Sequence, residues 1–183
     1  MHLVEDSPNT FEGSFTKDLI FSKFWLCQEV CKISSSLGIK SFDNIVVLGG
    51  WFGNMGLILE TYPIKFDHLT MIDADPACAK VAKMLLYRLG PKVTVMAVDA
   101  NTITYPASKS LLVINTSCND MPQEGWFDSI PKKALVAIQS RSDHEPLTEM
   151  DTCYPMSRTL FMESCPFSDP TTRYSRHMKI GLK

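Results

Sequence analysis

The sequence predicts an α/β fold: a three-layer α/β/α sandwich around a mostly parallel, seven-stranded sheet that ends in an antiparallel hairpin. Short apolar runs alternate with helical patterns after residue 38, as in parallel strands joined by helical crossovers. A glycine-rich turn directly follows the first of these runs, where open parallel sheets bind their ligands. Two later segments alternate polar and apolar residues, which indicates paired antiparallel strands.

The composition is that of an ordinary globular protein. Hydrophobic residues make up 45% of the 183 residues, so we expect a single domain over residues 1–183. The formal charge of -2 gives no strong signal for a nucleic-acid partner. No apolar run approaches the ~20 residues of a membrane helix, and the N-terminus lacks the pattern of a secretory signal. A cytoplasmic protein without membrane contact is therefore expected, and its oligomeric state stays open.

The cysteines and histidines show no metal-binding pattern. The six cysteines include no Cys-x-x-Cys pair, and the four histidines have no ligand spacing such as His-Glu-x-x-His. In a reducing compartment the cysteines would stay thiols. We therefore expect no metal.

Residues 1–39 are expected to precede the sheet. The first ten are polar, and residues 1–15 are predicted to be a flexible N-terminal segment. Over residues 16–37 apolar side chains recur mostly at three- and four-residue intervals, which predicts an amphipathic helix. Gly38 follows, where helices commonly end in a left-handed residue. Residues 40–183 would then form the ligand-binding core.

The predicted parallel strands are almost wholly apolar, as expected for strands that are buried on both faces of a sheet. They cover residues 45–48, 69–72, 93–98, 111–114 and 134–138. Helices are predicted between them at residues 54–61, 76–89 and 124–129.

The C-terminal third has a different pattern. Residues 158–163 and 173–180 alternate polar and apolar side chains without a long helix between them, which predicts an edge hairpin. The preceding connection, residues 141–155, is long, polar and contains proline. Loops of this length are usually functional or mobile, so we expect this one to lie over the mouth of the site.

The strongest functional signal is the turn Leu48-Gly49-Gly50-Trp51-Phe52-Gly53, which joins the first predicted strand to a helix. Glycines tolerate positive φ and let the backbone approach a ligand closely. Gly49, Gly50, Trp51 and Gly53 are therefore candidate ligand contacts, although a tight turn alone would explain the same residues.

Acidic residues follow the next two strands. Asp73 ends the second strand about 20 residues beyond the turn, the spacing at which a carboxylate reaches a ribose. Asp75 precedes Pro76 and is explained by a helix N-cap. Asp99, followed by Ala100, ends the third strand, where it could accept a hydrogen bond from an adenine amine or only cap the strand.

Polar residues also follow the fourth strand. Asn115 and Ser117 could orient a substrate amine or hydroxyl, or could only tie down the turn. Cys118 would be a nucleophile only beside a base that lowers its pKa. His144, within residues 141–155, could accept a proton from the substrate, although polar loop residues are often only solvated.

Two lysines and two tryptophans are expected to have structural roles and not to contact a ligand. Lys17 and Lys23 could meet a ligand carboxylate, but lysines of an amphipathic helix usually lie on its solvent-exposed face. Trp25 and Trp126 are expected to pack rather than to stack on a ligand.

These features occur in the order that is found in class I S-adenosylmethionine-dependent methyltransferases, and residues 40–183 resemble that Rossmann-like family. In the family, the glycine turn holds the methionine part of S-adenosyl-L-methionine, and acids after the second and third strands hold the ribose and the adenine. The resemblance implies these roles, in that order, for Gly49 with Gly53, for Asp73, and for Asp99 with Ala100. It implies a site for the acceptor at Asn115, where amine methyltransferases often carry Asp or Asn followed by two prolines.

A narrower likeness is to small, mostly uncharacterised, virus-encoded methyltransferase-like proteins. It rests on residues 48–53, 115–118, 139–140 and 174–181. Two residues depart from the family pattern: Val47 replaces an acid, and Trp51 replaces the middle glycine. The Trp51 indole would either clash with the cofactor in its usual pose or form a wall of the pocket. No prolines follow Asn115, so the resemblance does not imply an amine acceptor.

The resemblance implies a methyltransferase that acts on a small molecule or on another amine or hydroxyl acceptor. Positioning of the acceptor against the reactive methyl group would supply most of the acceleration. Another transferase with the same cofactor, for example one that moves the aminocarboxypropyl group, and a non-catalytic binding module both stay open. A nicotinamide dehydrogenase is disfavoured because the turn lacks Gly-x-Gly-x-x-Gly spacing.

Overall fold

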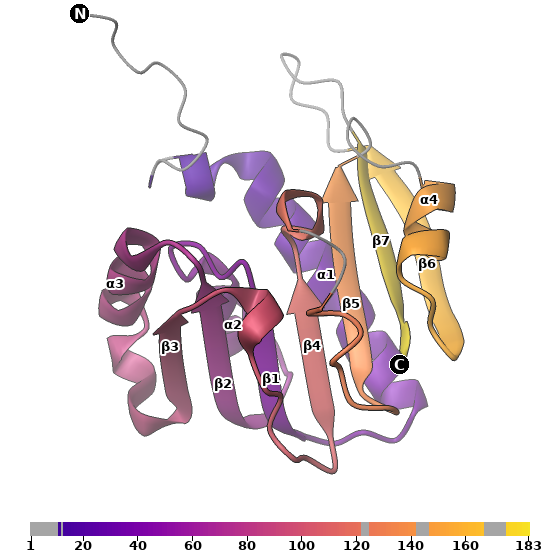
Figure 1. Ribbon diagram of the computed structural model, residues 1–183, viewed down its shortest axis with the longest axis horizontal. Helices are drawn as coiled ribbons and strands as arrows, with labels where there is room; N and C mark the ends of the chain where they lie inside the picture. The colour runs from indigo at the N-terminus through magenta and orange to yellow at the C-terminus, as the bar shows by residue number, and fades with distance from the viewer. Residues whose placement is uncertain (1–10, 12, 122–124, 142–146, 167–174) are drawn as a thin grey trace, which may run out of the picture.

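Figure 1 shows the computed structural model, which describes residues 11, 13–121, 125–141, 147–166 and 175–183. A seven-stranded sheet in the order β3-β2-β1-β4-β5-β7-β6 runs through the molecule. The pairs from β3 to β5 are parallel, and β7 is antiparallel to both β5 and β6. The predicted α/β fold with a mostly parallel sheet and an antiparallel C-terminal hairpin is confirmed.

The elements follow the predicted alternation. The strands are β1 (Phe42–Leu48), β2 (Phe66–Asp73), β3 (Val93–Ala97), β4 (Leu111–Asn115), β5 (Leu135–Arg141), β6 (Arg158–Pro166) and β7 (Ser175–Leu182). The α-helices are α1 (Lys17–Ser36), α2 (Asn54–Thr61), α3 (Pro76–Leu85) and α4 (Leu147–Cys153). Short 3-10 turns are η1 (Gly13–Phe15), η2 (Tyr87–Lys92), η3 (Ala100–Thr102) and η4 (Cys118–Asp120).

Three helices, α1, α2 and α3, cover one face of the sheet, and α1 lies behind the sheet in Figure 1. Leu26 and Val30, one turn apart on α1, are fully buried in one cluster with Val47 of β1 and Met178 of β7. Burial of each such side chain contributes about 1.5–3 kcal/mol. The helix ends before Gly38, whose φ is +71°. Its periodic apolar face therefore fixes α1 against the central strands.

The opposite face is covered by turns and by short helices. The segment predicted as a helix over residues 124–129 forms turns in its described part, so that prediction is wrong. One helical hydrogen bond, from Ser129 N–H to the Gly125 carbonyl, is followed by Pro131, and propagation of a helix stops there. Trp126 is fully buried among apolar side chains, as predicted.

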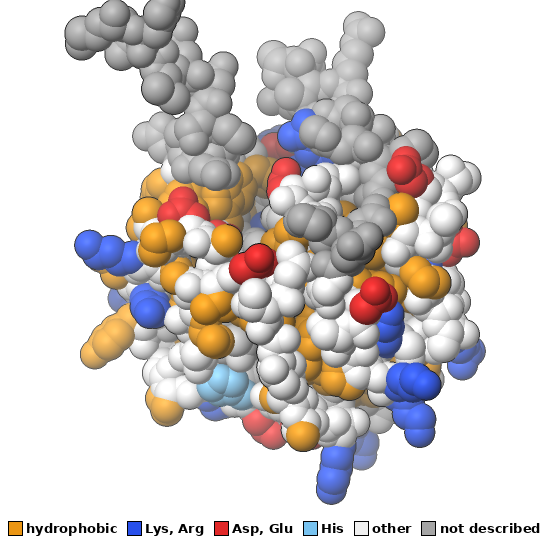
Figure 2. Space-filling view, in the orientation of Figure 1, with side chains coloured by type: hydrophobic (Ala, Val, Ile, Leu, Met, Phe, Trp, Pro, Cys, Tyr) orange, Lys and Arg blue, Asp and Glu red, His pale blue; other side chains and the backbone are white. Residues whose placement is uncertain are grey.

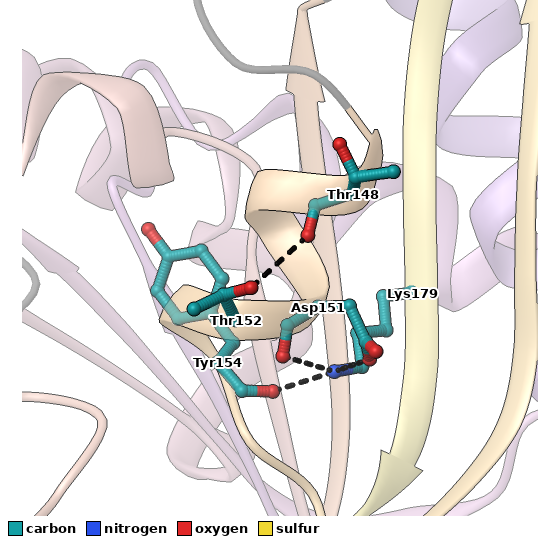
Figure 3. A network of polar contacts seen from close by, with 5 residues as sticks. All are labelled: Thr148, Asp151, Thr152, Tyr154 and Lys179. Carbon is teal, nitrogen blue, oxygen red and sulfur yellow. Dashed lines mark hydrogen bonds and ion pairs between the residues drawn. The ribbon is translucent and has the colours of Figure 1, made fainter.

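The connection after β5 contains α4 and is held to the sheet. Lys179 of β7 is fully buried, and its ammonium pairs with Asp151 at 2.7 Å and donates to the Tyr154 carbonyl at 2.7 Å (Figure 3). Met150 of α4 is also fully buried. The prediction of a loop is therefore wrong for residues 147–153, which form α4, and their position over the mouth of the site stays a prediction. Residues 142–146 lie outside the described residues, and so does the candidate His144.

Within the described part of the chain, none of the helices has the length and apolar character that a membrane crossing needs. All six cysteines lie in this part as free thiols.

Candidate functional site

The carboxyl ends of β1, β2 and β4 bring the predicted ligand contacts to one edge of the sheet. Leu48 at the end of β1 pairs with Ile72 on one side and with Asn115 on the other. The glycine turn, Asp73 and the turn after Asn115 are therefore neighbours. The chain order reverses between β1 and β4, and ligands of open α/β sheets bind at such a switch point.

The glycine turn has an unusual backbone. The φ angles of Gly49, Trp51 and Gly53 are +62°, +47° and +89°. A tryptophan in this left-handed region costs roughly 1–2 kcal/mol, because its Cβ crowds the following carbonyl. The strain persists only because the surrounding contacts fix the turn, and such strain is concentrated at functional sites.

Each glycine of the turn is explained by protein packing. A Cβ on Gly49 would lie 2.6 Å from the Ser117 side chain, and a Cβ on Gly53 would lie 3.2 Å from Ala82 of α3. A Cβ on Gly50 would lie 3.0 Å from the end of the Met71 side chain. The glycines thus let the turn sit tightly against β2, α3 and the β4 turn. Their contact with a ligand stays a prediction.

Asp73 holds the turn from the adjacent strand. One carboxylate oxygen accepts a 2.7 Å hydrogen bond from the Trp51 N–H, and the other accepts a 2.9 Å bond from the Asp75 N–H. Each oxygen has a second lone pair, so the half-buried carboxylate can still accept from a ligand hydroxyl. Asp75 accepts from the Ala77 N–H at 2.8 Å, which confirms the predicted N-cap of α3.

The buried thiol of Cys78 donates to the Asp75 carboxylate at 3.5 Å. Burial, and then the charge of the Asp73 carboxylate, raise the pKa of Cys78 to about 12, so the thiol stays protonated near neutral pH.

Asp99 follows β3 and is exposed, whereas Ala100 is buried. The Asp99 carboxylate accepts from the backbone N–H of Asn101 at 2.9 Å and from its side-chain amide at 3.1 Å. Asp99 therefore caps η3, in agreement with the interpretation of this residue as a cap at the end of the strand. An adenine contact stays a prediction for both residues.

Asn115 and Ser117 lie beside the glycine turn. Asn115 is fully buried, and its side-chain oxygen accepts a 2.9 Å hydrogen bond from the Ser117 N–H. Its amide nitrogen lies 3.5 Å from the sulfur of Met121. Asn115 thus fixes the turn after β4. The Ser117 side chain packs against Gly49 of the glycine turn. Contact of either side chain with an acceptor stays a prediction.

Trp51 offers an unpaired donor at the same edge. Its indole Nε1 is buried and has no hydrogen-bond partner within the described residues. The ring stacks on Phe52 at 5.8 Å between centroids, and Phe52 meets Phe11 edge-on at 5.6 Å. A buried donor without a partner costs about 1–3 kcal/mol, which a ligand acceptor would recover.

Lys23 of α1 is buried, contrary to the prediction for a lysine of an amphipathic helix. It is 5% exposed, so the expectation of a solvent-exposed position is wrong, whereas Lys17 is exposed as expected. Burial, and then the charge of Arg176, lower the pKa of Lys23 to about 8. The signal was its spacing, because Lys23 precedes Leu26 by three residues and Cys27 by four, which places it on the apolar face.

The ammonium of Lys23 donates to the Thr116 hydroxyl at 3.4 Å, directly after β4. A second cation, Arg176 near the start of β7, is also 5% exposed. No three His, Cys, Asp or Glu side chains of the described residues come together as metal ligands would.

A separate groove of about 430 Å³ lies on the sheet face away from α1, lined by strand residues such as Val46, Thr70 and Ile72 and by residues 102–106. Gly49 and Asp73 do not line it. Among the described residues on this face, Lys and Arg side chains lie mainly around the rim (Figure 2).

Comparison with solved structures identifies the fold. The chain superposes on the N-methyltransferase NodS from Bradyrhizobium japonicum WM9 in complex with S-adenosyl-L-homocysteine, with a TM-score of 0.68 and 11% identity over 97% of this chain and 93% of that one. A SAM-dependent methyltransferase from Aquifex aeolicus gives a TM-score of 0.66 and 13% identity, over 96% and 99% of the two chains.

The [4+2]-cyclase SpnF is also similar, with a TM-score of 0.56 and 12% identity over 75% of this chain and 60% of that one. No family model matches the sequence, and no curated protein matches it. The chain therefore has the fold of the class I S-adenosylmethionine-dependent methyltransferases, and a fold by itself does not establish an activity.

Proposed function

We propose that this protein is an S-adenosyl-L-methionine-dependent methyltransferase that methylates an amine or hydroxyl group of a small molecule. The observation that carries the proposal is the link between Asp73 and the glycine turn at the switch point of the sheet. It places carboxylate lone pairs beside a strained turn at the edge where this fold binds ligands. The similarity to NodS, named as an N-methyltransferase, supports an amine among the possible acceptors.

The residues at this edge fit the cofactor. Asp73 has free lone pairs for the ribose hydroxyls, and the unpaired indole N–H of Trp51 can donate to a cofactor oxygen or nitrogen. The absence of side chains at Gly49, Gly50 and Gly53 would let the methionine part of the cofactor approach the backbone of the turn closely. Asp99, with Ala100, would bound the adenine beyond β3, at the far end of the same edge.

The cofactor would supply an electrophilic methyl group, and the chain would hold the acceptor in line with it. Asn115 and Ser117 lie on the side of the glycine turn that faces β4, where they would bound the acceptor. Positioning supplies the acceleration in such a transfer, and one proton must leave the acceptor. We assign that proton to His144 or to solvent.

A small-molecule acceptor is consistent with the described residues of the sheet face away from α1, whose Lys and Arg side chains lie mainly around the rim (Figure 2). We also expect the protein to work in the cytoplasm. We also propose that the protein is related to the small virus-encoded methyltransferase-like proteins. This relation does not identify the acceptor.

A second candidate is a binding or catalytic module that uses the fold without methyl transfer, including one that transfers the aminocarboxypropyl group. The departure at Trp51 favours this alternative, because a positive-φ tryptophan reshapes the turn that would hold the methionine part. The cyclase SpnF has the same fold, which supports the possibility of another activity.

Calorimetry with S-adenosylhomocysteine tests the cofactor, and we expect a dissociation constant in the micromolar range, about -8 kcal/mol of binding free energy. Mass spectrometry of small-molecule extract incubated with the protein and methyl-labelled cofactor then tests the reaction. A mass increase of one labelled methyl group supports methyl transfer, and an aminocarboxypropyl adduct supports the alternative transferase. Absence of binding at millimolar ligand would contradict the proposal.

A further inference from the structure

Two buried cations, Lys23 and Arg176, lie together beside the candidate site. Gln139 of β5 donates a 2.8 Å hydrogen bond to the Ser22 carbonyl, which fixes the second turn of α1 against β5. On β5, Gln139 pairs with Met178 and Arg141 pairs with Arg176. Arg176 and Met178 alternate with the residues between them, so both side chains are on the face that α1 covers.

The charges of this pair are poorly compensated on the side of Lys23. Its ammonium makes one long hydrogen bond, 3.4 Å to Thr116, and no ion pair with a described carboxylate. Cys27 and Asp18 act in the opposite direction, but their influence on the pKa of Lys23 is smaller than that of burial and of Arg176, and that of Asp18 is the smallest. Burying the Lys23 ammonium near a like charge is costly, and an anion placed beside it would remove much of that cost.

We propose that Lys23 and Arg176 form a binding site for the carboxylate of the acceptor, so that the acceptor is a small carboxylate-bearing amine or alcohol. The inference rests on the proposed function for the identity of the bound molecule as an acceptor. A carboxylate has two oxygens, one for the ammonium of Lys23 and one or both for the planar fork of Arg176.

The position along the edge of the sheet favours the acceptor over the cofactor. The candidate cofactor contacts Asp99, Asp73 and Gly49 follow β3, β2 and β1 in spatial order. Thr116, which contacts Lys23, follows β4, and Arg176 belongs to β7 beyond β5. The two cations therefore lie past the methionine end of the proposed cofactor, on the side where an acceptor would approach.

The cofactor has a carboxylate of its own, and the test separates the two sources. Lys23→Met removes the ammonium and keeps an apolar side chain of similar length. Lys17→Met is the matched control, because it removes one charge from the exposed side of the same helix. Lys23→Gln provides the same readout should the methionine variant fail to fold.

Sodium acetate is the probe for the carboxylate, with acetamide plus sodium chloride as the neutral control at equal ionic strength. With S-adenosylhomocysteine bound, we expect acetate to raise the melting temperature of the wild type and of Lys17→Met by about 2 °C or more. We expect no acetate-specific shift for Lys23→Met. Affinities for S-adenosylhomocysteine and for 5′-methylthioadenosine, which lacks the amino-acid part, should stay within about twofold in that variant.

Two results would overturn the proposal. If Lys23→Met weakens S-adenosylhomocysteine about tenfold or more but leaves 5′-methylthioadenosine unchanged, the cations hold the carboxylate of the cofactor and not that of the acceptor. If acetate shifts no variant differently from acetamide, the cations hold no carboxylate. Failure of the wild type to bind either nucleoside would contradict the proposed function instead, and acetate titration of the free protein would still report on the cations.

Discussion

The carboxylate of Asp73 accepts a 2.7 Å hydrogen bond from the backbone N–H of Trp51, across the gap between β2 and the glycine turn. This bond holds a tryptophan at a φ of +47°, where most side chains are strained. The residue that would bind a ribose is thus also the residue that shapes the turn. Its substitution is expected to change both the stability of the fold and the affinity for the cofactor.

Asp73→Ala should lower the free energy of unfolding by about 2–3 kcal/mol, because it leaves the N–H groups of Trp51 and Asp75 without their acceptor. It should also weaken S-adenosylhomocysteine about tenfold or more. Asp75→Ala, the control, removes only a helix cap and should cost about 1 kcal/mol with little change in affinity. Urea denaturation and calorimetry measure both quantities. A larger loss of affinity in Asp75→Ala would show that the wrong carboxylate was assigned to the ribose.

Trp51→Phe should change the free energy of unfolding by no more than about 1 kcal/mol, because the smaller ring can still stack on Phe52 and removal of the unpaired indole N–H offsets the lost ring contacts. It should weaken S-adenosylhomocysteine by about 1 kcal/mol, or roughly fivefold, through loss of the indole donor. Calorimetry on both proteins provides the comparison. Equal affinities would restrict Trp51 to a wall of the pocket.

Asn115→Ala should destabilise the fold by about 1–3 kcal/mol, because the Ser117 N–H loses its buried acceptor. Well below the melting temperature it should also lower methyl-transfer turnover, while cofactor affinity changes only a few-fold. Ser117→Ala tests the second proposed acceptor residue without disturbing the turn, since it keeps the N–H and the Cβ against Gly49 and removes only the hydroxyl. Full turnover in folded Asn115→Ala would remove this residue from the acceptor site and direct attention to His144.

Lys23 should make stability depend on pH above neutrality. Its pKa is about 8 in the fold against an ordinary 10.5, because of burial and of Arg176, which outweigh the opposing influences of Cys27 and Asp18. Between these values the unfolded chain binds more protons, so the free energy of unfolding rises with pH. We expect Lys23→Met to be more stable than the wild type at pH 7, by an amount that shrinks by about 3 kcal/mol at pH 10.5. Urea denaturation of both proteins between pH 7 and pH 10.5 measures this difference. A difference in the free energy of unfolding that does not change with pH would contradict the expectation.

Local patterns were sufficient to predict most of the fold. The segments that form β1 and β4 are apolar because both of their faces are buried. Consecutive apolar residues are therefore enough to predict these strands. The cap formed by Asp75 with Pro76 is equally local, and it appears as predicted. The helix predicted over residues 124–129 is absent from its described part, residues 125–129, because helical periodicity in so short a segment does not outweigh the tertiary packing of Trp126.

By itself, the sequence determined the order of strands and helices, the carboxyl edge at which Asp73 stands and the glycine turn beside it. Only the tertiary structure decided what those groups contact. It placed the Trp51 N–H on Asp73, used Asn115 to hold a turn, and brought Lys23 of α1 together with Arg176 of β7. The physical reason is range: periodicity and capping act within a few residues of chain, whereas burial of a charge depends on strands that are distant in sequence and meet only in the sheet.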